Sequence, residues 1–348
     1  MSNTSVYIED YEYILQSDFI PFENLQTATV LISGGTGLIG STLINALLYA
    51  NQTRGFHTRI LAVVRNSEKA KSMLRQDEGL VLLKGSVENL PVITEPVDYI
   101  VHAASPTSSR FFMNQPVETI QAGVLGTMNL LGLAKEKCVK GFVYLSSMEA
   151  YGTVLSEAPL KEADLGYLNP AETRSCYPEC KRMCEAMCHA YATEYRVPAC
   201  SVRLSQTFGP GISRNDQRVF AMMARNALAK EDIILQTKGN SRHSYLYTAQ
   251  AVTAVLTVLL KGVPGSVYNA ANPDTYCSIY EMAEMVAEKI GRNRISVRTA
   301  ENGDTSKYPA PSYLNLDISA LTALGWRPTG DLLMLYERMI AGMDQSLR

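Results

Sequence analysis

The sequence lacks the features of a membrane, secreted or nucleic-acid-binding protein. No apolar run in its 348 residues approaches the length needed to cross a bilayer, and residues 1–24 have neither a basic start nor an apolar core. Charge of neither sign dominates, because 32 basic and 34 acidic residues are mixed along the chain and leave a net charge of -2. We therefore expect no nucleic-acid partner and no membrane partner.

The cysteines do not suggest a secreted, disulfide-bonded protein either. The chain has seven cysteines, an odd number, which argues against a disulfide framework and for a reducing, cytoplasmic location. Four of them, Cys176, Cys180, Cys184 and Cys188, recur every four residues and would line one face of a helix. Metal ligands must converge from different directions, so this row predicts small apolar helix contacts and no metal site.

The chain does have enough apolar residues, 46%, for a sizeable core. Short apolar runs rich in β-branched residues alternate with helical patterns such as that of residues 116–137. The runs read as strands lie at 29–33, 59–64, 81–87, 97–104 and 141–147. This alternation predicts an α/β fold with a doubly wound parallel sheet, the Rossmann fold.

The same patterns suggest how the chain is divided. Residues 1–26 are expected to form an N-terminal extension with a short packing helix, and residues 27–205 to form mainly the dinucleotide-binding domain. Residues 206–348 are expected to form mainly a smaller, interleaved C-terminal substrate lobe, from which about 240–265 return to the first domain.

A glycine-rich turn follows the first strand directly. Gly34, Gly37 and Gly40 have the spacing that gives a tight turn, a bare backbone for a pyrophosphate and close packing of the next helix, expected to begin near Ser41. The helix N-terminus would face the phosphates. We therefore expect a dinucleotide to bind at Gly34, Gly37, Leu38, Ile39 and Gly40.

The end of the second strand bears on the choice of cofactor. Arg65 stands where an acidic residue would normally bind the adenosine ribose. Arg65, with Ser67 and Lys69 nearby, is suited to the 2′-phosphate of NADP, but an arginine can also stack on the adenine of NAD. The residues leave NAD and NADP equally open.

Small residues at the ends of the third and fourth strands would let a dinucleotide pass close to the backbone. The residues expected to line it there are Ser86, Val87, Ala103, Ala104 and Ser105. His102, at the end of the fourth strand, is expected to pack against neighbouring side chains and not to act as an acid or base.

Tyr177 and Lys181 are the candidate catalytic pair. On a helix their spacing of four stacks them on one face, and a lysine ammonium there is expected to lower the pKa of the phenol toward neutrality. Tyr177 would then act as a general base. Ser147 and Glu149 follow the fifth strand, at the sheet edge where such folds bind ligands. A strand-end serine often caps the backbone, but beside this pair we expect Ser147 to be catalytic.

Together these motifs resemble the extended short-chain dehydrogenase/reductases, the family of nucleotide-sugar epimerases, dehydratases and decarboxylases, from Val30 to about Ile340. Several stretches are most similar to its UDP-glucuronate decarboxylase branch. These stretches are 102–106, 126–135, 169–170, 174–177, 208–210, 216–219 and 324–326.

The resemblance implies a role for each matched residue. Tyr177 would take the proton of a sugar hydroxyl, Lys181 would tune Tyr177 and bind the cofactor ribose, Ser147 would donate to the same sugar oxygen, and Glu149 would supply a carboxylate. A nucleotide-diphosphate sugar is the implied substrate, and a homodimer the implied assembly. The residues expected to contact the substrate are Ser147, Met148, Gln206, Arg218 and Arg242.

The two arginines of this set can be interpreted in two ways. A guanidinium pairs well with phosphate oxygens, which would suit Arg218 and Arg242 to the nucleotide diphosphate; otherwise they are solvated surface side chains.

Three residues depart from the family pattern. Met148 stands where 4,6-dehydratases have an aspartate and decarboxylases a serine, so it departs from the pattern of both and weakens both assignments. Gln206 replaces an asparagine, and Gln250 an aspartate. A thioether donates no proton, so dehydration ranks below decarboxylation and epimerisation.

We accordingly expect an NAD(P)-dependent enzyme that oxidises a nucleotide-sugar hydroxyl, at C4, to a ketone and then decarboxylates or epimerises the sugar. A one-way NADPH-dependent ketosugar reductase, which Arg65 would suit, and a 4,6-dehydratase are the alternatives within enzymes. A non-catalytic dinucleotide-binding regulatory protein is the alternative of another class, because fold does not fix function.

Overall fold

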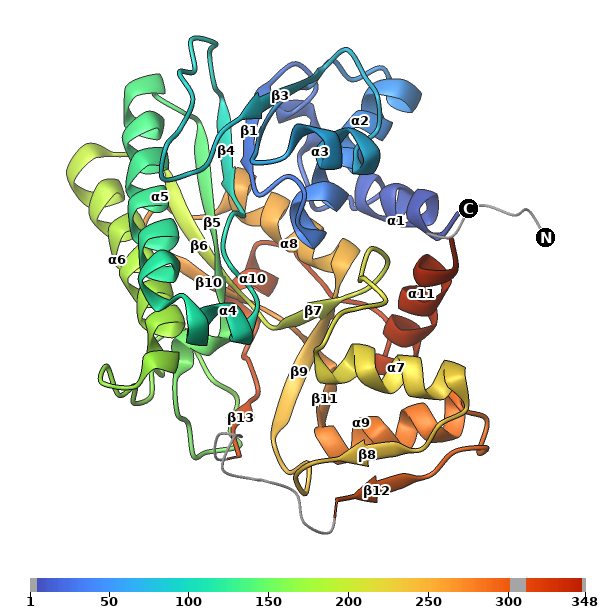
Figure 1. Cartoon of the computed structure of the whole chain (residues 1–348). Coiled ribbons are helices and arrows are strands. Elements are labelled where there is room, and N and C mark those ends of the chain that lie inside the picture. The colour runs from blue at the N-terminus through green and yellow to red at the C-terminus, as the bar shows by residue number, and fades with distance from the viewer. Residues whose placement is uncertain (1–4, 301–310, 346–348) are drawn as a thin grey trace.

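The computed structural model describes residues 5–300 and 311–345 (Figure 1). The remaining parts of the expected N-terminal extension and C-terminal lobe, at 1–4, 301–310 and 346–348, lie outside the described residues. Among the described residues, no helix combines the length and apolar character that a bilayer crossing requires.

The centre of the molecule is a seven-stranded parallel sheet. Its strands lie in the order β10-β6-β5-β4-β1-β2-β3, and every neighbouring pair is parallel. The strands are β1 (Thr29–Ser33), β2 (Arg59–Val64), β3 (Leu80–Lys84), β4 (Tyr99–His102), β5 (Gly141–Ser147), β6 (Ala199–Leu204) and β10 (Val267–Ala270). Strand order outward from β1 in both directions confirms the doubly wound α/β fold.

Helices cover both faces of this sheet (Figure 1). One face packs on α5 (Pro116–Lys137) and α6 (Cys176–Tyr195), and the other on α2 (Leu38–Arg54) and α8 (Thr248–Lys261). Successive residues of β1 show the alternation, since Val30 and Ile32 enter the core under α2 and α8 while Leu31 enters the core under α5 and α6. Because both faces are covered, the strands read as continuous apolar runs.

The cysteine row of α6 lies at its contact with α5. Cys180, Cys184 and Cys188 are buried there, and a Cβ at Gly123 of α5 would collide with the Cys180 Sγ. This confirms the prediction of a small-residue helix contact.

Several elements begin or end at other residues than expected. Strands β3 and β4 stop at Lys84 and His102, so the residues that follow them lie in loops beyond the carboxyl edge of the sheet. Helix α2 begins at Leu38 and not near Ser41, because Gly37 already accepts a hydrogen bond from the Ser41 N–H at 2.9 Å.

A smaller lobe is built beside the carboxyl edge. Its four-stranded sheet has the order β11-β9-β13, with β7 also paired to β9, and β8 pairs with β12. Its strands are β7 (Gln206–Phe208), β8 (Ile233–Leu235), β9 (Arg242–Tyr247), β11 (Asn272–Ser278), β12 (Val297–Thr299) and β13 (Tyr313–Leu314). Its helices are α7 (Val219–Ala229), α9 (Ile279–Met285) and α11 (Leu332–Gln345). Between β9 and β11 the chain returns to the main sheet to form α8 and β10.

The remaining helices are short or terminal: α1 (Val6–Leu15), α3 (Ser67–Met73), α4 (Ser109–Asn114) and α10 (Ser319–Ala323). Helix α1, near the N-terminus, contacts α11, near the C-terminus. Its buried Asp10 accepts hydrogen bonds from Tyr247 at 2.7 Å and from Arg338 of α11 at 2.7 Å. The N-terminal helix is therefore fixed by a charged contact as well as by packing.

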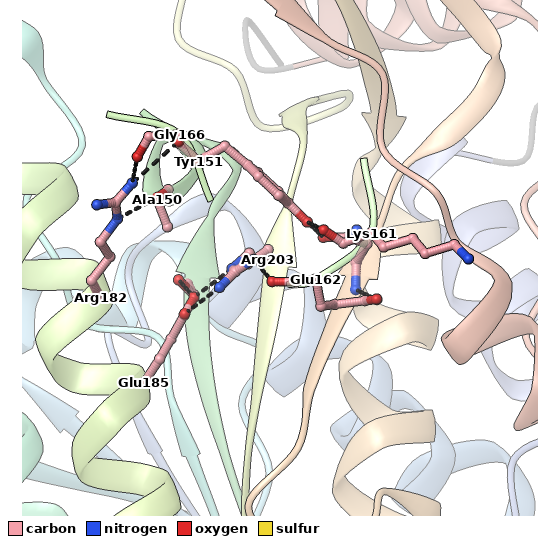
Figure 2. Close-up of polar contacts among 10 residues, drawn as sticks. Ala150, Tyr151, Lys161, Glu162, Gly166, Arg182, Glu185 and Arg203 are labelled. Carbon is pink, nitrogen blue, oxygen red and sulfur yellow. Dashed lines mark hydrogen bonds and ion pairs between the residues drawn. The ribbon is translucent and has the colours of Figure 1, made fainter. Parts of the chain in front are cut away.

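A buried polar network lies under the carboxyl end of β5 (Figure 2). Arg203 of β6 donates to both carboxylate oxygens of Glu185 of α6, at 2.9 and 2.7 Å, and Ser146 donates to the same carboxylate at 2.5 Å. Arg203 and Glu185 are 3% and 7% exposed as side chains. The network joins β5, β6 and α6 close to the candidate catalytic residues, which lie at the end of β5 and in the first turns of α6.

A second arginine fixes the chain that follows β5. Figure 2 shows Arg182 of α6 reaching the carbonyl groups of three residues, and its Nε lies 2.7 Å from the Ala150 oxygen. Its Nη2 donates to the carbonyl oxygens of Tyr151 and Gly166 at 3.2 and 2.7 Å. Helix α6 thus holds the segment after β5 by its backbone.

The buried ion pair gives a test of stability. We expect Glu185→Leu to lower the free energy of unfolding by about 3–5 kcal/mol, because it leaves the Arg203 charge buried without its partner. The double variant Glu185→Leu, Arg203→Met removes both charges and should lose less. Urea denaturation at neutral pH measures both, and a double variant that is less stable than the single one would contradict the expectation.

Candidate active site

The glycine turn between β1 and α2 is shaped for close approach. Gly34 has a φ of +73°, and a Cβ there would lie 2.7 Å from the carbonyl carbon of Ala103. A Cβ at Gly37 would meet only the Gly34 oxygen, at 3.2 Å, so the other space around it is open. The N–H groups of Leu38, Ile39 and Gly40 belong to the first turn of α2, where backbone donors have no partner within the helix. These residues fit a dinucleotide pyrophosphate.

His102, at the end of β4, connects β1 and α5 beside this turn through its two ring nitrogens. Its Nδ1 lies 2.8 Å from the Ser33 Oγ, and its Nε2 lies 3.1 Å from the Thr127 Oγ1 of α5. Burial lowers the pKa of His102 to about 3, so the ring is neutral. The prediction that His102 packs against neighbouring side chains is confirmed, and that it does not act as an acid or base stays a prediction. The Ser33 hydroxyl also accepts a hydrogen bond from the Ala104 N–H at 3.2 Å.

The other residues expected at the cofactor lie beyond the same sheet edge. Arg65 follows β2 directly and is exposed, and Ser105 follows β4 after Ala103 and Ala104. In the loop after β3, Ser86 caps the Asn89 N–H at 3.2 Å and Val87 is buried. Their contacts with a dinucleotide, and the choice between NAD and NADP at Arg65, stay predictions.

Tyr177 and Lys181 lie in the first two turns of α6, on the buried side. The Lys181 Nζ donates to the Leu145 carbonyl oxygen at 2.7 Å and lies 5.5 Å from the centre of the Tyr177 ring. Both side chains are buried. The spacing of four therefore places the pair on one helix face, against the end of β5.

Ser147 and Glu149 meet this pair from the strand. Ser147 is the last residue of β5, and its Oγ accepts a hydrogen bond from the Glu149 N–H at 3.2 Å. Its hydroxyl also interacts with the Tyr177 phenol and lowers the pKa of that phenol. The serine is thus a cap for the 3-10 turn Met148–Tyr151 and a neighbour of the candidate base.

Lys181 was expected to lower the pKa of the Tyr177 phenol, but among the residues of the protein itself that pKa is raised. Burial raises the pKa of the Tyr177 phenol, and the Glu149 carboxylate raises it further. A phenolate loses the solvation of water when buried, and a negative neighbour disfavours it. Burial also lowers the pKa of Lys181. The positive charge that was expected to stabilise the Tyr177 phenolate is therefore itself disfavoured.

Arg174 belongs to the site and was not among the expected residues. Its Nη2 lies 2.5 Å from the Glu149 Oε2, and its guanidinium carbon lies 5.0 Å from the centre of the Phe112 ring. Phe112 of α4 stacks on Tyr177 with ring centres 4.2 Å apart and 12° between the planes. The sequence did contain a signal for Arg174, because an arginine three residues before the candidate base Tyr177 is close enough to reach it.

Met148 points into apolar surroundings. It packs against a small core cluster made of Tyr151, Leu160, Ala271, Leu314 and Leu316. The position therefore supplies neither a proton donor nor a charge next to Ser147.

Two of the three substrate residues expected in the smaller lobe are already paired with carboxylates. Arg218, before α7, pairs with Asp216 at 2.6 Å, and Arg242, at the start of β9, pairs with Glu281 at 3.1 Å. Gln206 begins β7 and lies opposite Tyr245 of β9. The structure thus places Ser147, Glu149, Tyr177 and Lys181 together, and the remaining three on the lobe beside the sheet edge. Their contact with a substrate stays a prediction.

The described residues contain no group of three or more His, Cys, Asp or Glu side chains able to hold a metal ion. All seven cysteines are free.

A glycine turn that fits a dinucleotide, followed along the sheet edge by a Ser, Tyr and Lys constellation, defines a dinucleotide-dependent enzyme fold. The family model described as "NAD dependent epimerase/dehydratase family" matches residues 30–271, and the chain belongs to this family. This confirms the family expected from the motifs, the enzyme class and the nicotinamide dinucleotide.

The chain is similar to UDP-glucuronic acid decarboxylase 3 of Arabidopsis thaliana, with 32% identity over 300 residues that cover 86% of this chain and 84% of the relative. Among solved structures it is similar to a UDP-glucose 4-epimerase from Thermotoga maritima (TM-score 0.76, 19% identity, 92% of this chain and 100% of the other). It is also similar to a dTDP-glucose 4,6-dehydratase from Streptomyces venezuelae solved with NAD (TM-score 0.73, 19% identity, 91% and 97%). These structures share the fold.

We expect Tyr177→Phe to lower turnover by ~10²-fold or more, because the variant keeps the ring that stacks on Phe112 but loses the hydroxyl that exchanges the proton. Steady-state turnover and a cofactor titration measure the two effects separately. Cofactor affinity should be largely kept. Turnover near that of the unmutated protein would rule out Tyr177 as the base.

Proposed function

We propose that the protein oxidises the C4 hydroxyl of UDP-glucuronate and decarboxylates the resulting 4-ketosugar. The observation that carries this is the carboxyl end of β5, where Met148 lies in an apolar cluster and the Glu149 carboxylate is paired with Arg174. Neither residue offers a proton to a departing hydroxyl, which dehydration would need. Decarboxylation expels no hydroxyl and so needs no acid for a leaving group, and the proton that C5 takes afterwards can come from water.

The residues divide the reaction as follows. The Tyr177 oxygen takes the proton of the C4 hydroxyl, the Ser147 hydroxyl donates to the same sugar oxygen, and Lys181 orients the cofactor ribose. The glycine turn at Gly34, Gly37 and Gly40 would hold a bound NAD, which would supply the acceptor and later the donor of the C4 hydride and so would not be consumed. The C4 ketone makes the C5 carboxylate a β-keto acid, whose C5–C6 bond breaks to release carbon dioxide. The electron pair of the broken bond passes to the C4 oxygen, beside which Ser147 and Tyr177 lie. The resulting enolate takes a proton from water at C5, which restores the C4 ketone before the hydride returns to C4.

The nucleotide part is assigned to the smaller lobe. We propose that Arg218 and Arg242 contact the diphosphate, with Gln206 close to the sugar. The side chains of Arg218 and Arg242 are 37% and 29% exposed although each is paired with a carboxylate. A guanidinium has enough donors to bind a carboxylate and a phosphate at the same time. Met148 is only partly buried by its apolar cluster, and we propose that its exposed part contacts the sugar.

A panel of sugars tests the reaction. We expect UDP-glucuronate to lose carbon dioxide, with a turnover on the order of 10 per second as is usual for enzymes, while dTDP-glucose and UDP-N-acetylglucosamine lose no water. Mass spectrometry of the products separates loss of carbon dioxide from loss of water, and an unchanged mass together with a new chromatographic peak would indicate epimerisation. Glu149→Gln should not create dehydration. Efficient water loss by the unmutated protein would refute the proposal.

We also propose that the protein acts as a homodimer in the cytoplasm. Seven free cysteines fit a reducing compartment. Helix α5 carries a row of exposed apolar side chains on its outer face, at Val117, Ile120 and Met128, which are 59%, 45% and 43% exposed. A contiguous apolar stripe of this kind supports a symmetric contact with a second copy.

Light scattering after size-exclusion chromatography tests the dimer. Ile120→Asp should convert dimer to monomer, because it would bury two charges in the symmetric contact. Val263→Asp, at a residue that is 60% exposed in the loop after α8, is the matched control and should leave the mass unchanged. A monomeric unmutated protein would contradict the proposal.

A further inference from the structure

Arg174 occupies a position between a carboxylate and the candidate base. It ends no strand and caps no helix, but lies in the 3-10 turn Thr173–Ser175 directly before α6. Its Nη2 is 2.5 Å from the Glu149 Oε2, and its guanidinium carbon is 5.9 Å from the centre of the Tyr177 ring. One cation therefore contacts the end of β5 and faces the phenol at the start of α6.

Aromatic packing holds the guanidinium in this place. The Arg174 guanidinium carbon lies 5.0 Å from the centre of the Phe112 ring, and Phe112 stacks on Tyr177 at 4.2 Å. The Cys176 Sγ donates to the Phe112 carbonyl oxygen at 3.7 Å, which fastens α4 to the start of α6. The arrangement of Arg174, Phe112 and Tyr177 thus comes from α4, the 3-10 turn and the start of α6, which the Cys176 hydrogen bond holds together.

We propose that Arg174 is a positioning residue that holds the Glu149 carboxylate at the end of β5 and compensates its negative charge beside the Tyr177 phenol. The inference deepens the proposed function, because it rests on Tyr177 being the base of the same site. Glu149 can then remain a carboxylate close to the substrate without suppressing the ionisation of Tyr177. Without the arginine, the two roles oppose each other.

The groups that face Tyr177 support this division. Beyond burial, the Glu149 carboxylate and the Cys180 thiol raise the pKa of the phenol, whereas the Ser147 hydroxyl and the Arg174 guanidinium lower it. Phe112 of α4 is uncharged, Lys181 lies one turn along α6, and the phenol of Tyr144 on β5 faces Tyr177 from the strand. Arg174 is therefore a cation that reaches both Glu149 and Tyr177.

The test compares the ionisation of Tyr177 in charge variants. Tyrosine labelled with ¹³C at the ζ position reports phenol and phenolate in the NAD-bound protein, and Tyr177→Phe assigns the signal. Arg174→Met should raise the midpoint of Tyr177 ionisation by about 0.5 to 1 pH unit, because the Glu149 charge is no longer opposed. Arg174→Lys, which keeps the charge, should move it less. Arg174→Gln is a second neutral variant.

The interaction with Glu149 separates charge compensation from a general structural role. Adding Glu149→Gln to Arg174→Met should bring the midpoint back down, because the charge that Arg174 opposes is then absent as well. Arg110→Met is the matched control, since Arg110 is an exposed arginine of α4. It should leave the midpoint unchanged. An unchanged midpoint in Arg174→Met and Arg174→Gln, or one that Glu149→Gln does not lower, would overturn the inference.

Activity provides a second, independent comparison. If the unmutated protein decarboxylates UDP-glucuronate, the acidic limb of its pH profile for kcat/KM should move upward in Arg174→Met by the same amount as the midpoint. A shift of one unit lowers the rate on that limb about tenfold. The NMR midpoint does not depend on the substrate, so it decides the role of Arg174 even where the sugar panel rejects the proposed reaction.

Discussion

Helix α6 and strand β5 must be held in one relative position for this site to exist. Tyr177 and Lys181 come from the helix, Ser147 ends the strand, and Glu149 lies in the 3-10 turn directly after it. The carboxylate of Glu185, fixed between Arg203 and Ser146, bonds the helix to β6 and to the residue before Ser147. A buried ion pair is costly to desolvate, but it has strict geometry, and here it sets the distance between helix and strand.

That position creates an electrostatic conflict at the base. A buried phenol resists ionisation, and the nearby carboxylate of Glu149 adds to the resistance. The two groups are nevertheless placed together, and the guanidinium of Arg174 lies against the carboxylate. In such a site the balance of charges among neighbours decides the protonation state more than any single residue does.

The cofactor edge and the substrate lobe depend on different physics. The glycine turn is defined by close contacts of backbone atoms, since a Cβ at Gly34 would collide with Ala103. The smaller lobe is defined by its own sheet, which β9 organises through β7, β11 and β13. The chain joins the two by returning to the main sheet through α8 and β10, so the lobe is fixed against the edge where β5 ends.

The sequence by itself determined the parallel sheet, the glycine turn and the pairing of Tyr177 with Lys181, because these follow from local periodicity and spacing. It also indicated the buried cysteine row and the packing of His102. Only the tertiary structure decided that Arg174 contacts Glu149, that Phe112 stacks on Tyr177, and that burial raises the pKa of Tyr177. Those facts depend on residues 25 to 65 positions apart along the chain meeting in space, and on loss of water around them, which neither spacing nor composition encodes.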